Sequence, residues 1–159
     1  MPIVETTRFG SLERVTVADD AIYHFPDGLP GFEHLTEFAL IEEQQFWPFT
    51  WLQPLAEAQI GFVLMDPALF AADYKPDINP QDVTCLDVVP DDLLDLRSIL
   101  VVPSEPKAAT ANLKAPLVLN RRTRSGKQVI LMDDHLSMRH PVFGDPARAS
   151  SELSATCSS

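Results

Sequence analysis

The stretch "LKAPLVLNRRTRSGKQVILM", residues 113–132, decides the fold. Two apolar runs, 113–120 and 127–132, flank the polar segment "RRTRSG". Runs of this kind around a short polar loop containing glycine are typical of a β-hairpin, and Ser125-Gly126 is expected to close the loop. Pro116 lies inside the first run and removes a backbone donor. We therefore expect that strand to lie at a sheet edge or to carry a bulge.

Short apolar runs bounded by proline, glycine or acidic residues recur along the rest of the chain, and the 14 prolines argue against a helical bundle. Phe9-Gly10-Ser11 is expected to form a tight turn between the first two strands. The predicted strands are residues 3–9, 13–17, 21–25, 37–41, 49–52, 60–65 and, buried on both faces, 97–103.

Three short helices are predicted, at residues 66–74, 79–88 and 90–97. Asp66-Pro67 and Asn79-Pro80 each supply an N-cap followed by proline at the first helical position. The predicted fold class is mainly β, a small antiparallel β-barrel or sandwich-like single domain with two or three short helices. Residues 1–143 form that domain, and the small polar residues 144–159 are expected to be a disordered tail.

The charge of the chain is unevenly distributed. Of the 159 residues, 1–96 hold 18 acidic and 3 basic side chains, whereas 97–159 hold 5 acidic and 9 basic ones, and the net charge is −11. An acidic field repels nucleic acid and anionic lipid and attracts basic proteins. We expect an acidic flank at Asp19, Asp20, Glu42 and Glu43. The alternative is that this charge serves solubility alone.

The cellular context is expected to be the cytoplasm. The first ten residues lack the basic and apolar regions of a signal peptide, and no apolar stretch approaches the roughly 18 residues of a membrane span. Cys85 and Cys157 fit neither a disulfide framework nor a metal-ligand spacing.

Enzyme chemistry has one candidate site. The segment "DDHLSMRH", residues 133–140, holds two aspartates and two histidines, residue types that can bind a metal ion, but a solvated turn is the favoured explanation. No nucleophile motif or phosphate-binding loop is present, so we expect neither catalysis nor a cofactor. The basic cluster at Arg121, Arg122, Arg124 and Lys127 has no interleaved aromatic residues, so we expect no direct binding of nucleic acid.

The densest aromatic cluster is "FWPFTWL", residues 46–52. Phe49 and Trp51 alternate along a predicted strand and are expected in the core. Trp47 either partly covers a loop or is an exposed anchor for a protein partner.

Four motifs occur in order along the chain: "FPDGLPGFE" (25–33), "TANLKAPLVLN" (110–120), "GKQVIL" (126–131) and "RHPV" (139–142). Together they resemble the FliW family of flagellar assembly factors. The segment "FVLMDPALFAADYKPDI", residues 62–78, is similar to the middle of that family. The resemblance covers residues 2–143.

The resemblance implies a monomeric, cytoplasmic, non-enzymatic regulator with a small β-barrel-like fold. It implies two protein partners, flagellin and the carbon storage regulator CsrA, a basic dimer that represses translation by binding mRNA leaders. FliW-like proteins bind CsrA away from its RNA surface and abolish RNA binding, and accumulating flagellin captures the factor and frees CsrA. Two alternatives remain: a flagellin chaperone without a translational role, and a small β-barrel metal-dependent enzyme that uses the cluster Asp133–His140.

The first motif also has a structural interpretation. Two turns, at Pro26-Asp27-Gly28 and Pro30-Gly31, aim Leu29 and Phe32 at fixed points, and we expect these two side chains to plug one end of the barrel. An exposed binding loop is the alternative. The proposed partner contacts are Thr110, Asn112, Lys114, Pro116, Asn120 and Trp47, most of which belong to the second motif at a predicted sheet edge. For those in the second motif, satisfying a bulged edge is an equally good explanation.

Overall fold

The structure is a computed structural model that describes residues 1–143. The predicted tail, residues 144–159, lies outside the described residues. The strands are β1 (Ile3–Thr6), β2 (Glu13–Thr16), β3 (Ile22–His24), β4 (Glu37–Ile41), β5 (Thr50–Pro54), β6 (Phe62–Met65), β7 (Leu94–Val101), β8 (Thr110–Ala111), β9 (Leu117–Asn120), β10 (Ser125–Gln128) and β11 (His140–Pro141). The helical segments are all 3₁₀: η1 (Asp19–Ala21), η2 (Gln44–Phe46), η3 (Pro67–Leu69), η4 (Pro80–Leu86) and η5 (Pro106–Ala108).

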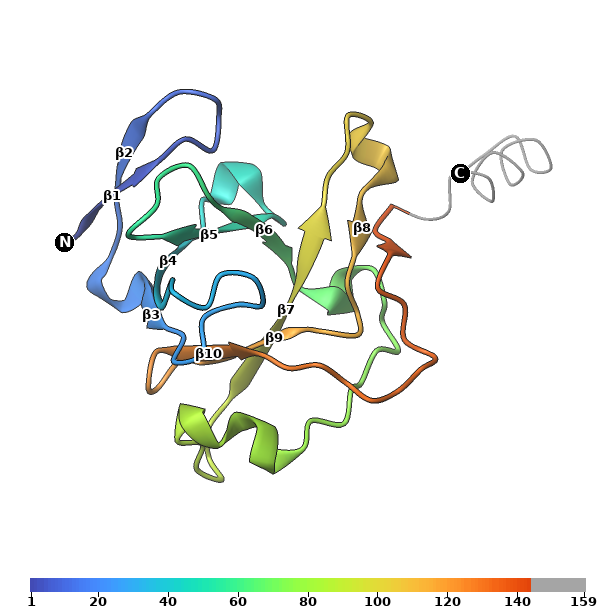
Figure 1. Ribbon diagram of the computed structural model, residues 1–159. Helices are drawn as coiled ribbons and strands as arrows, with labels where there is room; N and C mark the ends of the chain where they lie inside the picture. The colour runs from blue at the N-terminus through green and yellow to red at the C-terminus, as the bar shows by residue number, and fades with distance from the viewer. Residues whose placement is uncertain (144–159) are drawn as a thin grey trace, which may run out of the picture.

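Seven strands close into a barrel. The sheet runs in the order β7, β6, β5, β4, β3, β10, β9, and β9 then pairs back with β7, as the ring of strands in Figure 1 shows. All these pairings are antiparallel except β3 with β10, which meet in parallel at His24 and Ser125. The predicted mainly β barrel is confirmed. Strands β8 and β11 extend the sheet beyond the ring at the end of β7.

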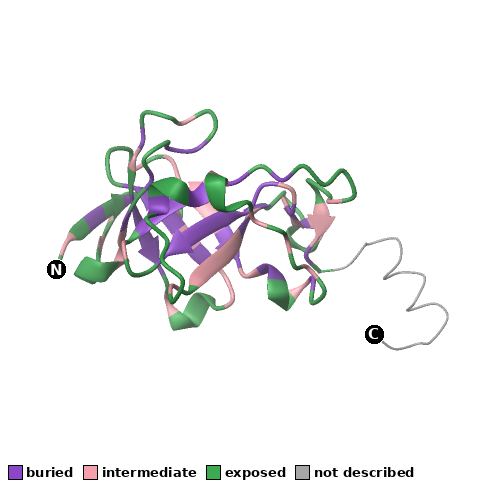
Figure 2. Cartoon of the chain, turned by 90° about the horizontal axis from the view of Figure 1, so that it is seen from below, coloured by how far each residue is buried: buried purple, intermediate pink, exposed green. Residues whose placement is uncertain are grey.

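The core follows the two-residue alternation of the strands. Leu117 and Leu119 of β9 belong to the largest apolar cluster, together with Phe25, Phe38 and Leu52, all fully buried or nearly so. This cluster fills the barrel, and buried segments converge on the centre of the molecule in Figure 2.

The outer faces of the barrel strands are covered in part by other elements. Val118 of β9 packs under η4 and the segment 129–131. The β1–β2 hairpin covers Ala39 and Ile41 of β4.

The hairpin predicted from residues 113–132 is present as β9 and β10, with two corrections. Ser125 and Gly126 do not close the loop, because Ser125 already pairs with Asn120. Residues 121–124 form the loop, and Arg124 takes the left-handed conformation with φ of 52°. Gly126 is needed for packing, since a Cβ atom there would lie 2.5 Å from the Phe25 ring.

Of the two alternatives expected at Pro116, a sheet edge or a bulge, the sheet edge is wrong. Strand β9 follows Pro116 directly and is paired on both sides, with β7 and with β10. Pro116 itself is buried, and its carbonyl accepts a hydrogen bond from the Val129 amide at 2.9 Å. Pro116 has no backbone N–H to donate, but it lies just before the first residue of β9. The missing donor therefore interrupts no strand pairing.

The predicted helices are shorter than expected. Asp66 and Asn79 do cap helical turns, accepting hydrogen bonds from the amides of Ala68 and Gln81 at 3.0 Å. The helix expected at residues 90–97 is absent, because residues 94–97 pair with β9 as the start of β7. That strand is only half-buried along most of its length, so the prediction of burial on both faces is wrong.

Candidate functional site

The first motif forms two hydrogen-bonded turns between β3 and β4. The Gly28 amide donates to the Phe25 carbonyl at 2.9 Å, and the Phe32 amide donates to the Leu29 carbonyl at 2.7 Å. In the second turn Pro30 and Gly31 are the central residues, and Gly31 has φ of 86°. Leu29 is only 2% exposed, and Phe32 packs against the same core cluster with its ring 5.5 Å from that of Phe62. Pro26 lies exposed on the outside of the first turn.

A cavity of about 420 Å³ lies where the motifs meet, and we call it the motif cleft. Three of the four motifs contribute to its lining, and Met138, the residue before "RHPV", lines it as well. The lining residues are Leu29, Pro30, Phe62, Ile99, Asn112, Lys114, Ala115, Gln128, Ile130 and Met138. Segments that are as much as a hundred residues apart in sequence thus build one surface.

The second motif supplies the polar part of the motif cleft. Asn112 Oδ1 accepts hydrogen bonds from the amides of Lys114 and Ala115 at 3.0 and 3.2 Å, which fixes a tight turn before β9. The Lys114 ammonium lies 3.2 Å from the carboxylate of Asp134. Thr110 is half-buried in β8 and does not line the cleft.

Tyr74 secures this turn from the other side. Its hydroxyl donates to the Leu113 carbonyl at 2.6 Å, and burial raises the pKa of Tyr74 to about 12. The hydroxyl therefore stays protonated, and remains a donor, across the physiological pH range.

The apolar part of the cleft includes side chains that sequence reasoning missed. Ile130 and Met138 are 62% and 63% exposed. The two-residue alternation of a strand, continued past β10, could have identified Ile130 as exposed. Val129 and Leu131 are buried, whereas Ile130 and Met132 face outward. Exposed apolar side chains gathered beside a cleft are typical of a protein-binding surface, and methionine adapts well to different partners.

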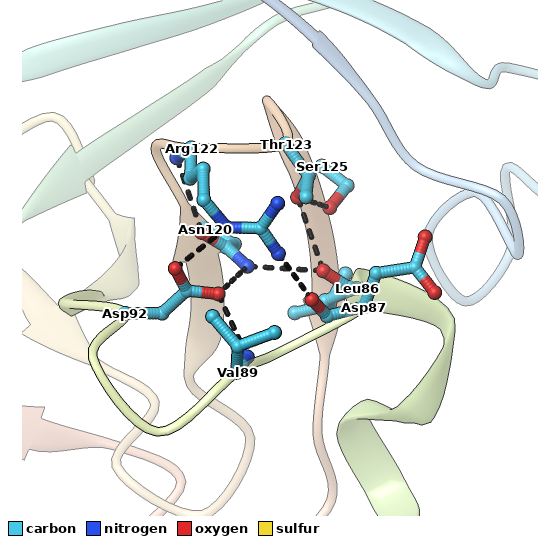
Figure 3. Close-up of polar contacts among 8 residues, drawn as sticks. All are labelled: Leu86, Asp87, Val89, Asp92, Asn120, Arg122, Thr123 and Ser125. Carbon is cyan, nitrogen blue, oxygen red and sulfur yellow. Dashed lines mark hydrogen bonds and ion pairs between the residues drawn. The ribbon is translucent and has the colours of Figure 1, made fainter.

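Asn120 is not a contact residue, and this prediction is corrected. Its side chain is fully buried, and Nδ2 donates to the Leu86 carbonyl and to Asp92 Oδ2, both at 3.0 Å (Figure 3). Arg122 joins the same network, with Nε 2.7 Å from Asp92 Oδ1. The network ties η4 and the start of β7 to the β9–β10 hairpin. Pro116, buried as well, is equally unavailable to a partner.

The four residues of the predicted acidic flank do not form one surface. Asp20 and Glu42 line the same small polar cavity, of about 200 Å³, together with Tyr23, Arg121 and Arg124. Asp19 is next to it in η1, with its side chain 82% exposed. Glu43 instead forms an ion pair with Arg8. Asp19 lies 3.9 Å from the N-terminal ammonium. The exposed acidic side chains of this region are Asp19, Asp20 and Glu42, which we call the acidic flank from here on.

Most side chains of the basic cluster are paired with acids from residues 1–96. Arg121 pairs with Asp95, Arg122 with Asp92, and Lys127 lies 3.8 Å from Asp27. These pairs explain why a positive loop on this acidic protein offers little free positive charge.

Two further predicted features lie apart from the cleft. Trp47 is 71% exposed beside η2, whereas Phe49 and Trp51 are half-buried against the outer clusters. Within residues 1–143, no three His, Cys, Asp or Glu side chains converge on a position that could hold a metal ion. The segment Asp133–His140 therefore does not assemble the site that the enzyme alternative needs. Among the same residues, no helix has the length and apolar character of a membrane span.

A family model described as "FliW protein" matches residues 3–142. The chain belongs to the FliW family. This FliW-family chain is 36% identical over 150 residues to the flagellar assembly factor FliW of Thermotoga neapolitana, covering 94% of this chain and 99% of that protein. It is 37% identical to the one from Thermoanaerobacter pseudethanolicus, covering 88% and 92%.

The fold agrees with that assignment. The crystal structure of a flagellar assembly factor FliW superposes on this FliW-family chain with a TM-score of 0.80 at 30% identity, covering 91% of this chain and 99% of the other. The resemblance drawn from the four motifs is confirmed, and three of those motifs line the motif cleft. The curated relatives carry the name flagellar assembly factor.

Proposed function

We propose that this FliW-family protein is a cytoplasmic, monomeric regulator that binds both flagellin and the RNA-binding protein CsrA. It antagonises the repression of flagellin mRNA by CsrA without covering the RNA site of CsrA. Family membership supports a role in flagellar assembly, and the two surfaces described above support two kinds of protein contact.

The observation that carries the CsrA part is the exposed acidic flank. Asp19, Asp20 and Glu42 belong to a stretch, Val15 to Tyr74, that has no lysine or arginine. Arg121 and Arg124 line the same cavity as Asp20 and Glu42, and Arg121 is paired with Asp95. RNA binding depends steeply on the positive potential of the protein that binds it. An acidic surface docked beside a basic RNA-binding protein lowers that potential, so RNA is released although its site stays uncovered.

The motif cleft supports the flagellin part. Subunits of a filament expose, before assembly, apolar surface that the filament later buries. The cleft offers the exposed apolar side chains of Ile130 and Met138, with Lys114 and Asn112 at its polar side. We assign flagellin to this cleft and the acidic flank to CsrA.

The test is release of a flagellin mRNA leader from CsrA by the purified protein. In the double variant Asp20→Lys/Glu42→Lys, we expect about tenfold weaker antagonism, because the potential beside the RNA is no longer lowered. Raising the ionic strength to about 0.3 M should weaken antagonism by the wild type more than by this variant, since screening acts on the same charges. Thermal unfolding of both proteins checks that the fold is kept.

The matched control is Glu57→Lys/Asp77→Lys, which changes the net charge equally at two exposed positions away from the acidic flank. It should antagonise CsrA within about twofold of the wild type. Equal losses in both double variants would refute a local role of the flank. Separate pull-downs with flagellin and CsrA complete the test, because capture of flagellin alone would identify a chaperone without a translational role.

A further inference from the structure

A second apolar cavity, of about 360 Å³, lies on the outer surface of the barrel and shares no lining residue with the motif cleft. We call it the hairpin groove. Ile41, Trp51 and Val63 form its floor. They lie side by side on β4, β5 and β6, on the face opposite to the barrel core.

Two walls rise from this floor. Phe9, in the turn of the β1–β2 hairpin, and Phe46 of η2 form one wall, and Val102 and Pro106 border the groove beyond β7. Phe9 is 61% exposed, Val102 47% and Phe46 37%, which is a large amount of apolar surface in one place. Exposed patches of this kind mark interaction sites in proteins that otherwise stay monomeric.

The groove is held in shape without a ligand. The Trp51 indole donates from Nε1 to Gln53 Oε1 at 2.8 Å. Its ring lies over Gly61, where an added Cβ atom would come within 2.1 Å of it. The hairpin wall is fixed by Arg8, whose guanidinium lies 4.6 Å from the centre of the Phe9 ring and pairs with Glu13 and Glu43.

The charge around the groove is acidic. Arg8 is the one cation among the lining residues, but its side chain is 5% exposed and is engaged by two carboxylates. Residues 41–51 and 63, which supply most of the lining, belong to the stretch without lysine or arginine. One guanidinium facing two carboxylates leaves one net negative charge beside the apolar rings.

We propose that the hairpin groove binds a segment of a partner protein that presents two or three apolar side chains next to lysine or arginine, a basic amphipathic segment. The groove shares no lining residue with the motif cleft or with the cavity of the acidic flank, so it is a separate docking site for a third contact. The apolar side chains pack on Trp51 and Val63, and the basic ones face the partly exposed carboxylates of Glu13 and Glu43.

Two other occupants fit the groove less well. The chain after Phe143 starts nearby, since the Phe143 ring lies 6.4 Å from that of Phe49, but residues 144–159 contain one leucine and one basic residue. A second copy of this chain would bring a second net charge of −11 to an acidic surface, and like charges repel.

The experiment uses the full chain, labelled with ¹⁵N, and two synthetic amphipathic peptides of equal length, one of leucine and lysine and one of leucine and glutamate. We expect the lysine peptide to shift the amide signals of Phe9, Phe46 and Val102, and to bind about tenfold more tightly than the glutamate peptide. Equal affinity for the two peptides, or shifts confined to the motif cleft, would overturn the proposal.

Groove variants separate specific docking from general attraction to an acidic protein. Phe46→Ser/Val102→Ser should weaken the lysine peptide about tenfold without a change of charge. The control Leu55→Ser/Leu93→Ser removes two apolar side chains that are 41% and 83% exposed elsewhere, and it should bind as the wild type does. Equal loss in both variants contradicts the proposal.

The other occupants give distinct results. Tighter peptide binding after truncation at residue 143 would show that the tail covers the groove, and concentration-dependent shifts without peptide would show a second copy there. Either result overturns the assignment to a partner segment. None of these readouts involves CsrA or flagellin, so failure here leaves the proposed function to its own test.

Discussion

Two glycines of the first motif differ sharply in what their positions permit. Both have positive φ, 63° at Gly28 and 86° at Gly31, a conformation that costs an L-residue about 1–2 kcal/mol. At Gly28 an added Cβ would also lie 2.7 Å from the Phe32 carbonyl oxygen and the Glu33 Cα, whereas nothing lies within 4 Å of one at Gly31. The same residue type therefore serves packing at one position and turn geometry alone at the other.

This difference predicts the rank of two alanine variants. Gly28→Ala should lower the free energy of unfolding by about 3 kcal/mol, because backbone strain adds to a clash with backbone atoms that cannot move aside. Gly31→Ala should cost about 1 kcal/mol from strain alone. Urea denaturation of both variants measures the two values, and equal losses would contradict the packing role of Gly28.

At the scale of secondary-structure elements, the connection from η4 to β7 depends on one carboxylate. Asp92 Oδ2 accepts from the Val89 amide at 2.9 Å and from Asn120, and Oδ1 binds Arg122. The hydrogen bond from Arg122, with that from the Val89 amide, lowers the pKa of Asp92 to about 2. The carboxylate is therefore the charged centre that keeps this connection on the hairpin.

The lowered pKa predicts how stability depends on pH. A carboxyl group with a depressed pKa in the folded state stabilises fully above its unfolded pKa, about 3.9, and loses that contribution as pH falls through about 2. Asp92→Asn should therefore unfold at a lower temperature than the wild type at pH 7. Below about pH 4 the difference in melting temperature should shrink, and a difference independent of pH would show that the charge of Asp92 is not what stabilises the connection.

The sequence predicted elements well where local chemistry determines them. The β9–β10 hairpin, the N-caps at Asp66 and Asn79 and the two turns around Leu29 all appear in the structure. The prediction failed at residues 90–97. This acidic run suits the start of a helix, but the chain forms a turn there, and residues 94–97 then pair with β9. Pairing between distant strands overrides local propensity, and a single sequence does not show it.

The same limit explains the outcome for the candidate site. Asn112 and Lys114 were predicted only as partner contacts, and the structure places them in one polar turn beside Leu29, Gln128 and Ile130. Asn120 was misjudged because its partners, Leu86 and Asp92, are about thirty residues away. The place of a residue in a motif does not show whether that residue stabilises the fold or contacts a partner.

For the whole molecule, closure of the barrel predicts how stability is distributed. The seven barrel strands have neighbours on both sides, whereas β1, β2 and β11 each have one unpaired side. Hydrogen–deuterium exchange should therefore be slowest in β4, β5 and β6 and faster in β1, β2 and β11, because opening the ring requires breaking two ladders at once. Fast exchange throughout β9 would mean that the contact between β7 and β9 does not close the ring in solution.

Closure also determines how a partner is recognised. The backbone donors and acceptors of strand β9 form hydrogen bonds with β7 and β10. A partner protein therefore cannot add a strand to the sheet at β9. Recognition of the partner must depend on the side chains that surround the motif cleft. Such positions can be exchanged one at a time while the scaffold stays folded, which leaves partner preference free to change as the partner's own sequence changes.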